Sequence, residues 1–266
     1  MNRRTFWTTA SLKALVFLIL ISSRTAQGAP RVVHVFVALA DNQNQGIVPV
    51  PVALGNGNDP ARNLYWGAAF GLKSFFKASR DWELVEGGRG GSTAVLERCV
   101  FRHRTEDVLL VADAYQGSRI RDAVIDFLSA AAGLGAESIK VREPSEALSV
   151  SAGGASDLIV YIGHDAFMDF QLSAIHGEKG TKERQVIVLA CASKAFFGPY
   201  LRGSGSTPLL WTTGLMAPEA YTLKAALDGW ISHEDHEAIR QSAARAYDKY
   251  QKCGDRAALR LFASGW

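Results

Sequence analysis

Several segments of the chain have the pattern of strands that are buried on both faces. Each is a short run of apolar residues, rich in Val, Ile and Leu, without the polar residue at every second position that marks a half-exposed strand. The many β-branched residues favour strands over short helices. The predicted strands span residues 32–40, 108–112, 158–162, 186–190 and 209–212, and residues 82–85 are a shorter candidate.

Amphipathic segments lie between these strands. Residues 118–132 place apolar side chains at helical spacing, so that one face of a helix is apolar. Asp59-Pro60 has the pattern of a helix start, with Asp as the cap and Pro in the first turn, and predicts a helix to about residue 78. Residues 93–100 are ambiguous and are assigned as helical. Further helices are predicted over residues 218–230, 234–252 and 256–262.

Strands that alternate with helices indicate βαβ units and a mainly parallel sheet with helices on both faces. The 266 residues, 48% hydrophobic and 21% charged, have an ordinary globular composition. No internal repeat, low-complexity tract or clear linker divides the sequence. We therefore predict one α/β domain over residues 29–266.

Residues 1–28 have the three-part layout of a signal peptide for export. Arg3 and Arg4 give a positive start, an apolar run follows, and small residues fit a cleavage site near the end. The apolar run is short for a membrane-spanning helix, which needs about 20 residues. An uncleaved N-terminal anchor is the alternative. We expect a periplasmic or secreted protein, exported by the general secretory or the twin-arginine route, with no membrane contact beyond this segment.

The net charge of +3 comes from this first segment. Of the 29 basic residues, four lie in residues 1–28, which hold no acid, so the remaining 25 face 26 acidic residues. The basic balance therefore gives no argument for a nucleic-acid partner.

The chain holds three cysteines, an odd number for an exported protein, so at least one thiol stays free or pairs between molecules. Cys99 and Cys253 could form a disulfide and leave Cys191 as the thiol. The sequence does not establish that pairing.

Chemistry-bearing residues follow several of the predicted strands. In open parallel sheets, ligands bind beyond the carboxyl ends of the strands. His164 and Cys191 each follow a strongly predicted strand, and a thiol with an imidazole forms the minimal set for nucleophilic acyl transfer. A strand-end cysteine is also a common packing residue. The substrate-binding candidates at the same edge are Asp41, Asn42, Asn44, Asp113 and Ser193.

The specificity that these candidates would give stays open. Asp41 and Asp113 could favour a basic side chain of the substrate, but Asp is also a common cap and turn residue, which is the simpler reading. Lys194 and Arg202 could equally favour acidic substrates. The long loop over residues 43–58 could form a wall of the site or only close the end of the sheet.

Gly163-His164 at the end of one predicted strand, and Ala190-Cys191 at the end of the next, resemble the caspase-like cysteine peptidases. That group includes caspases, legumains, gingipains and bacterial CHAT domains. The resemblance covers residues 158–201 in motif and the whole mature chain in strand–helix order. It implies a caspase–haemoglobinase-like three-layer sandwich, hydrolysis of a peptide or protein substrate, Cys191 as nucleophile and His164 as general acid and base. It implies no metal or organic cofactor.

The chain departs from the family pattern beside both residues. The families usually place Gly directly after the His, and its N–H serves the oxyanion; here Asp165 follows, and its charge would oppose an oxyanion if it pointed inward. The families often place Gly shortly after the Cys, where this chain has Ala192. We expect the backbone N–H groups of Gly163, Asp165 and Ala192 to hold the oxyanion.

These departures leave two other functions open. The first is a catalytically silent caspase-like fold that acts as an exported peptide- or protein-binding module. The second is a non-peptidase hydrolase or transferase that uses the same pair. His233 and His236, with acids between them, have a spacing that can bind a metal on a helix face, but no third ligand is evident and the segment also fits a helix start. We predict no metal.

Overall fold

The structure is a computed structural model that describes residues 29–142, 148–173 and 182–266. The predicted signal segment, residues 1–28, lies outside the described residues. The strands are β1 (Arg31–Ala38), β2 (Trp82–Gly88), β3 (Val95–His103), β4 (Val108–Tyr115), β5 (Glu137–Val141), β6 (Leu148–Ala152), β7 (Leu158–Ile162), β8 (Gln185–Leu189), β9 (Thr207–Thr212) and β10 (Phe262–Ala263).

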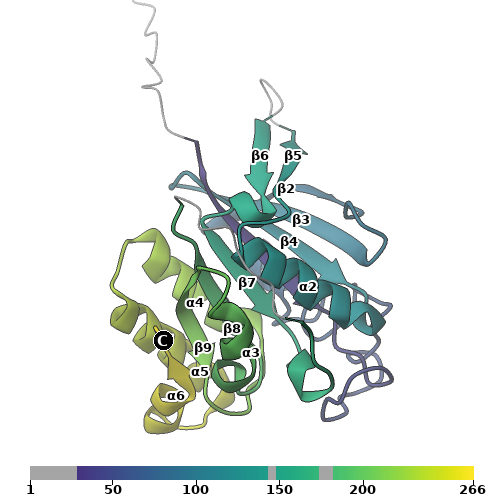
Figure 1. The fold of residues 1–266 in the computed structure, drawn as a ribbon, viewed down its shortest axis with the longest axis vertical. Coiled ribbons are helices and arrows are strands. Elements are labelled where there is room, and N and C mark those ends of the chain that lie inside the picture. The colour runs from purple at the N-terminus through teal and green to yellow at the C-terminus, as the bar shows by residue number, and fades with distance from the viewer. Residues whose placement is uncertain (1–28, 143–147, 174–181) are drawn as a thin grey trace, which may run out of the picture.

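The main sheet has eight strands in the order β10-β9-β8-β7-β1-β4-β3-β2, and β5 and β6 form a separate hairpin at one end (Figure 1). Strands β4, β1, β7, β8 and β9 run parallel. Strands β3 and β10 run antiparallel to their neighbours. The central strands β4 and β7 are buried along their whole length, which confirms that continuous apolar runs mark strands of this sheet.

Helices pack against both faces of this sheet (Figure 1). One face carries α2 (Ile120–Ala131) and α3 (Ser193–Leu201), whose apolar residues join those of β1, β7 and β8. The opposite face carries α1 (Leu72–Ala78), α4 (Ala220–Ile231), α5 (His236–Gln251) and α6 (Asp255–Leu261). The chain is therefore an α/β protein with a large, mostly parallel mixed sheet. No helix in the described ranges is long and apolar enough to cross a membrane.

The helix predicted over residues 93–100 is wrong, because this segment belongs to β3. It pairs antiparallel with β4 and buries Cys99, Val100 and Phe101. Pairing with a buried strand and burial of one face outweigh the weak local preference for a helix.

The helix predicted from Asp59 to residue 78 is correct only in its last part, α1. The Asp59 carboxylate does accept a hydrogen bond from a backbone N–H, that of Ala61, but the chain then continues in turns. The Asn63 side chain bonds both the N–H and the C=O of Ala40, which ties these turns to the end of β1. A Cβ at Gly67 would lie only 2.2 Å from the carbonyl oxygen of Ala61, so the backbone folds too tightly for a regular helix.

The three cysteines are unpaired in the structure. Cys99 is buried in β3, Cys253 is exposed after α5, and Cys191 is partly buried. The disulfide considered from the sequence between Cys99 and Cys253 is therefore not formed.

Candidate active site

The structure brings Cys191 and His164 to the same edge of the sheet. Strands β7 and β8 are parallel neighbours, and Ile162 pairs with Leu189. His164 and Cys191 therefore each lie two residues beyond a paired position. The N–H of Gly163 donates to the Leu189 carbonyl at 3.2 Å, so the two backbones stay together past the ends of the strands.

The turn after β8 presents Cys191 between a strand and a helix. Ala192 has φ 47°, a left-handed conformation that costs energy for a residue with a Cβ. The next residue, Ser193, begins α3. The sharp turn leaves the Cys191 side chain partly accessible at the end of β8.

The sulfur of Cys191 contacts the loop that follows β9. Its S–H donates to the Met216 carbonyl at 3.5 Å, and the Met216 N–H donates to the sulfur at 3.4 Å. Met216 belongs to the core on the α1 and α4 face, so the thiol lies on that face. Within the described residues, no hydrogen bond joins this sulfur to His164.

The imidazole of His164 is nearly buried and contacts an acid that sequence reasoning missed. Its Nε2 lies 2.9 Å from Oδ2 of Asp169, which also accepts the Gly46 N–H at 3.1 Å. The short 3-10 helix Ala166–Met168 turns the chain back so that Asp169 meets the ring. When Nε2 donates to Asp169, Nδ1 keeps its lone pair and can act as a base. An acid five positions after the histidine was the available sequence signal.

Asp165 is fully buried and points into the protein. Its Oδ1 accepts the Phe167 N–H at 3.0 Å and caps the short helix, while its Oδ2 finds no partner in the described part of the chain. Burial, with a smaller contribution from Asp169, raises the pKa of this carboxyl to about 7. Below that pH it is mostly neutral, so its charge opposes an oxyanion less than the sequence suggested.

The backbone N–H groups predicted for the oxyanion divide into two sets. Those of Gly163 and Ala192 already donate, to the carbonyls of Leu189 and Gly214 respectively. For the N–H groups of Asp165 and Cys191, the described residues supply no acceptor. Asp165 thus remains a candidate donor, and the N–H of Cys191 is a candidate that the sequence analysis did not name.

Three of the predicted substrate-binding residues hold the loop after β1 in place. Asp41 is buried and accepts from the backbone N–H groups of Gln43 and Asn44 and from the Asn44 side chain. The Asn42 amide bonds both backbone groups of Val50. These side chains hydrogen-bond within the protein, as expected if Asp41 is a cap or turn residue.

The other two predicted substrate-binding residues are buried away from the thiol. The Ser193 hydroxyl donates to the Val188 carbonyl and contacts Thr212. Asp113 pairs with Arg98 and His34 on the α2 face of the sheet. The structure therefore brings together the catalytic candidates but not the substrate-binding ones.

Comparison with models of known protein families, with curated proteins and with solved structures found no match.

Large apolar side chains are exposed on segments that surround this edge. Val48 and Val52 belong to the loop after β1, Met168 to the short helix after His164, and Leu215 to the loop that contacts Cys191. Phe70 is also exposed, and its backbone carbonyl accepts a hydrogen bond from the Ala220 N–H at the start of α4. Exposed apolar groups around a candidate nucleophile suit a ligand with apolar side chains.

Replacing Asp165 by asparagine is expected to change how stability depends on pH. Between about pH 4 and pH 7 the unfolded chain loses the Asp165 proton while the folded chain keeps it, so the free energy of unfolding falls as pH rises. Asparagine can still cap Phe167 but cannot ionise. The free energy of unfolding of Asp165→Asn lacks this fall. Between about pH 4 and about pH 8 we therefore expect the stability of the variant to rise, relative to that of wild type, by up to a few kcal/mol.

Urea unfolding at several pH values measures this difference. Asp107→Asn, an exposed acid on the turn before β4, is the matched control and should follow the wild-type curve. Parallel pH curves for Asp165→Asn and wild type would show that the Asp165 carboxyl is already ionised in the folded protein.

Proposed function

We propose that this protein is an exported cysteine hydrolase of the caspase-like type that cleaves peptide or amide bonds. Cys191 is the nucleophile and His164 the general acid and base. The observation that carries the proposal is the pairing of β7 with β8, because it puts a Gly-His and an Ala-Cys pair in register at the ends of neighbouring parallel strands. This is the placement that the resemblance to caspase-like peptidases implies, and a three-layer sandwich is the architecture we propose with it.

The first half of the reaction forms a thioester. His164 Nδ1 takes the thiol proton of Cys191, and the sulfur attacks the substrate carbonyl carbon to form a C–S bond. The carbonyl electron pair moves to the oxygen. The C–N bond then breaks, and the amine leaves with the proton that His164 held.

The second half hydrolyses the thioester. His164 removes a proton from a water molecule, whose oxygen attacks the same carbon. The C–S bond breaks, the acid product leaves, and the proton on His164 returns to the sulfur. The N–H groups of Asp165 and Cys191 are the proposed donors to the oxyanion in both halves.

The rim of the site supports a peptide substrate with apolar side chains. Leu215 is strongly exposed on the loop that contacts Cys191, and Val48 and Val52 are strongly exposed on the loop that contacts Asp169. They can cover apolar side chains of an extended peptide.

A cysteine-directed acyloxymethyl ketone probe tests the proposal, with labelled sites mapped by mass spectrometry. We expect the folded protein to be labelled at Cys191 near neutral pH, ahead of Cys99 and the exposed Cys253. His164→Ala should slow labelling of Cys191 while leaving Cys253 unchanged. Labelling of Cys191 no faster than in the unfolded chain would contradict the proposal.

Asp169 is proposed to orient His164, and Asp169→Asn tests it. The asparagine can keep a hydrogen bond to the ring but carries no negative charge, so it cannot stabilise the imidazolium that forms during the reaction. We expect kcat/KM, or the probe rate, to fall about 10- to 100-fold and its pH profile to shift to lower pH. Asp107→Asn is the control. A lower rate with an unchanged pH profile would assign Asp169 a purely structural role.

A catalytically silent binding module is the second candidate. The observation that favours it is the thiol proton of Cys191, which donates to the Met216 carbonyl rather than to His164. In this case the same edge would hold a peptide or protein without cleaving it. The probe separates the two, because a binding module keeps Cys191 inert while folded.

A further inference from the structure

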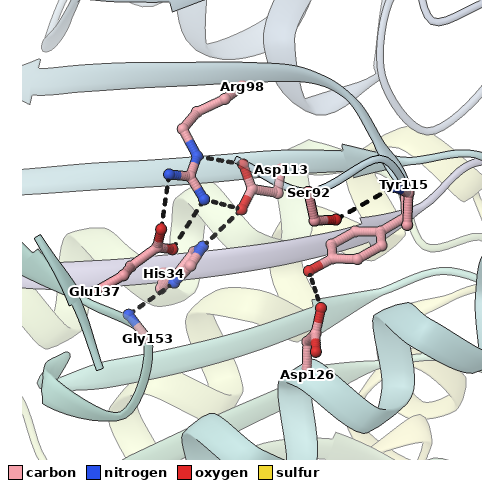
Figure 2. Close-up of polar contacts among 9 residues, drawn as sticks. His34, Ser92, Arg98, Asp113, Tyr115, Asp126, Glu137 and Gly153 are labelled. Atoms are coloured by element: carbon pink, nitrogen blue, oxygen red, sulfur yellow. Dashed lines mark hydrogen bonds and ion pairs between the residues drawn. The ribbon is translucent and has the colours of Figure 1, made fainter. Parts of the chain in front are cut away.

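A cavity of about 300 Å³ lies on the face of the sheet opposite to the Cys191 thiol. Its floor is formed by β1, β3 and β4, and its walls by α2, the turn between β2 and β3, and the start of β5. This volume is at the lower end of the range for small-molecule sites. Figure 2 shows the charged side chains that converge there from these elements.

The floor of the cavity is a network of charged and polar side chains that hydrogen-bond to one another. The Asp113 carboxylate accepts two hydrogen bonds from Arg98, both at 2.6 Å, and a third from His34 Nε2 at 3.1 Å. His34 Nδ1 accepts the Gly153 N–H at 3.0 Å, so the ring is a neutral imidazole with its proton on Nε2. Arg98 also donates twice to Glu137.

This network argues against a metal, although His34, Asp113 and Glu137 place possible ligand atoms within 4.8 Å of one another. The Arg98 guanidinium already supplies the positive charge between the two carboxylates (Figure 2). Both nitrogens of His34 are engaged, one as acceptor and one as donor. A metal would have to displace Arg98 and change the His34 tautomer.

The rim of the cavity carries negative charge that no cation in the network balances. Arg98 offsets one of the two carboxylates that it bridges, which leaves a net charge of −1. Asp126 adds a third carboxylate, whose Oδ2 accepts from the Tyr115 hydroxyl at 2.7 Å and whose Oδ1 receives no hydrogen bond from the described residues. Although Asp126 opens to solvent at the mouth, partial burial and the charges of nearby acids raise the pKa of its carboxyl.

We propose that this cavity binds a small organic cation of the alkylamine class. The ammonium group donates to Asp126 Oδ1 or to the remaining lone pairs of Glu137, since each carboxylate oxygen can accept two hydrogen bonds. Figure 2 shows Glu137 bonded to Arg98 and Asp126 bonded to Tyr115, and a linear diamine has one ammonium group for each acid. Phe36 and Val95 also line the cavity and can cover the methylene chain.

The same chemistry could come from a free diamine or from a lysine side chain of a peptide. Isothermal titration of the purified protein with cadaverine and with Nα-acetyl-lysinamide distinguishes these sources. Binding of either supports the proposal, and the tighter ligand identifies the source. 1,5-Pentanediol has the shape of cadaverine without its charge and should not bind measurably.

Two variants test whether the acids at the rim of the cavity bind the amine. Asp126→Asn and Glu137→Gln should each weaken binding about tenfold, since a hydrogen bond to a charged group is lost. Glu106→Gln removes the same charge from an exposed segment that does not line the cavity, so the affinity should stay within twofold of wild type. Melting curves of each variant show that it is folded.

Three outcomes would overturn the proposal. Neither amine binds, or pentanediol binds as tightly as cadaverine, or the rim variants bind like wild type. Zn²⁺ binding that is lost in His34→Ala, without any amine binding, would assign the cavity to a metal instead. Because the cavity and Cys191 lie on opposite faces, the result is independent of whether the protein is a hydrolase.

Discussion

Replacing Cys191 by alanine is expected to abolish amide hydrolysis by this protein. The sulfur supplies the bond that divides the reaction into acylation and deacylation, and no other described side chain at the ends of β7 and β8 can take its place. By analogy with nucleophile variants of other hydrolases, we expect kcat/KM to fall by about 10⁴-fold or more. Hydrolysis of a library of fluorogenic peptides, including sequences with apolar side chains, measures the effect.

Cys253→Ala is the matched control for this experiment. It removes an exposed thiol that donates to the neighbouring Gly254 carbonyl, away from the proposed site, so activity should stay at the wild-type level. Equal hydrolysis by Cys191→Ala and wild type would rule out Cys191 as the nucleophile. Wild-type protein that cleaves no member of the library, with Cys191 unreactive, would favour the binding module.

Replacing Arg98 by methionine is expected to destabilise the fold more than any other charge removal considered. The side chain of Arg98 is 15% exposed and that of Asp113 only 1%, and they share two hydrogen bonds at 2.6 Å. Burial by itself raises the pKa of Asp113, but the hydrogen bonds from Arg98 and His34 outweigh it and hold that pKa below its ordinary value. Without Arg98 the Asp113 charge stays buried with His34 as its remaining partner.

We expect Arg98→Met to lower the free energy of unfolding by about 3–5 kcal/mol, which is the cost of breaking a buried ion pair. For a chain of this length that corresponds to a fall in melting temperature of about 10 °C. The loss should shrink at low pH, because protonation of Asp113 removes the buried charge. Thermal unfolding followed by circular dichroism at several pH values measures both effects.

Arg104→Met is the control for the loss of a guanidinium. Arg104 pairs with Glu83 on the surface, where their side chains are 51% and 55% exposed, so its removal should cost about 0–1 kcal/mol. A variant of Arg98 that does not accumulate as folded protein agrees with the prediction. An equal, small effect of Arg98→Met and Arg104→Met would show that the network contributes little to stability.

The two proposed sites use the sheet differently. The proposed hydrolase site lies where parallel strands end, as is usual for α/β proteins, and it depends on loops. The cavity lies over the middle of β1 and β4, where His34 and Asp113 interrupt otherwise apolar strands. Buried charged residues within a strand therefore mark the second site, just as strand ends mark the first.

The strands of the sheet were predictable because burial on both faces allows few polar residues. This held for β1, β4, β7, β8 and β9, whose bounds differ from the prediction by a few residues. It failed for β3, where Glu97 and Arg98 are polar but have partners from distant segments, including Trp66 and Asp113. Polar residues satisfied by tertiary contacts look, in sequence, like residues exposed to solvent.

Helices show the same limit. Residues 193–201 form α3, a helix that the sequence analysis did not predict, and Gly198 and Pro199 lower the helix propensity of this segment. The packing of Phe197 and Leu201 against the sheet stabilises it. The sequence likewise did not indicate the β5–β6 hairpin, whose short alternating strands resemble loop segments.

The sequence by itself determined the class of fold and the two residues proposed for catalysis. Continuous apolar runs indicate strands that are buried on both faces of the sheet. The residue after each run therefore lies at the carboxyl end of a strand, where sites form in parallel sheets. Tertiary structure decided the long-range contacts: Met216 against Cys191, and Arg98 beside Asp113 on the other face of the sheet. These contacts join segments whose distance along the chain carries no local pattern, so only the folded arrangement brings their charges and hydrogen-bonding groups together.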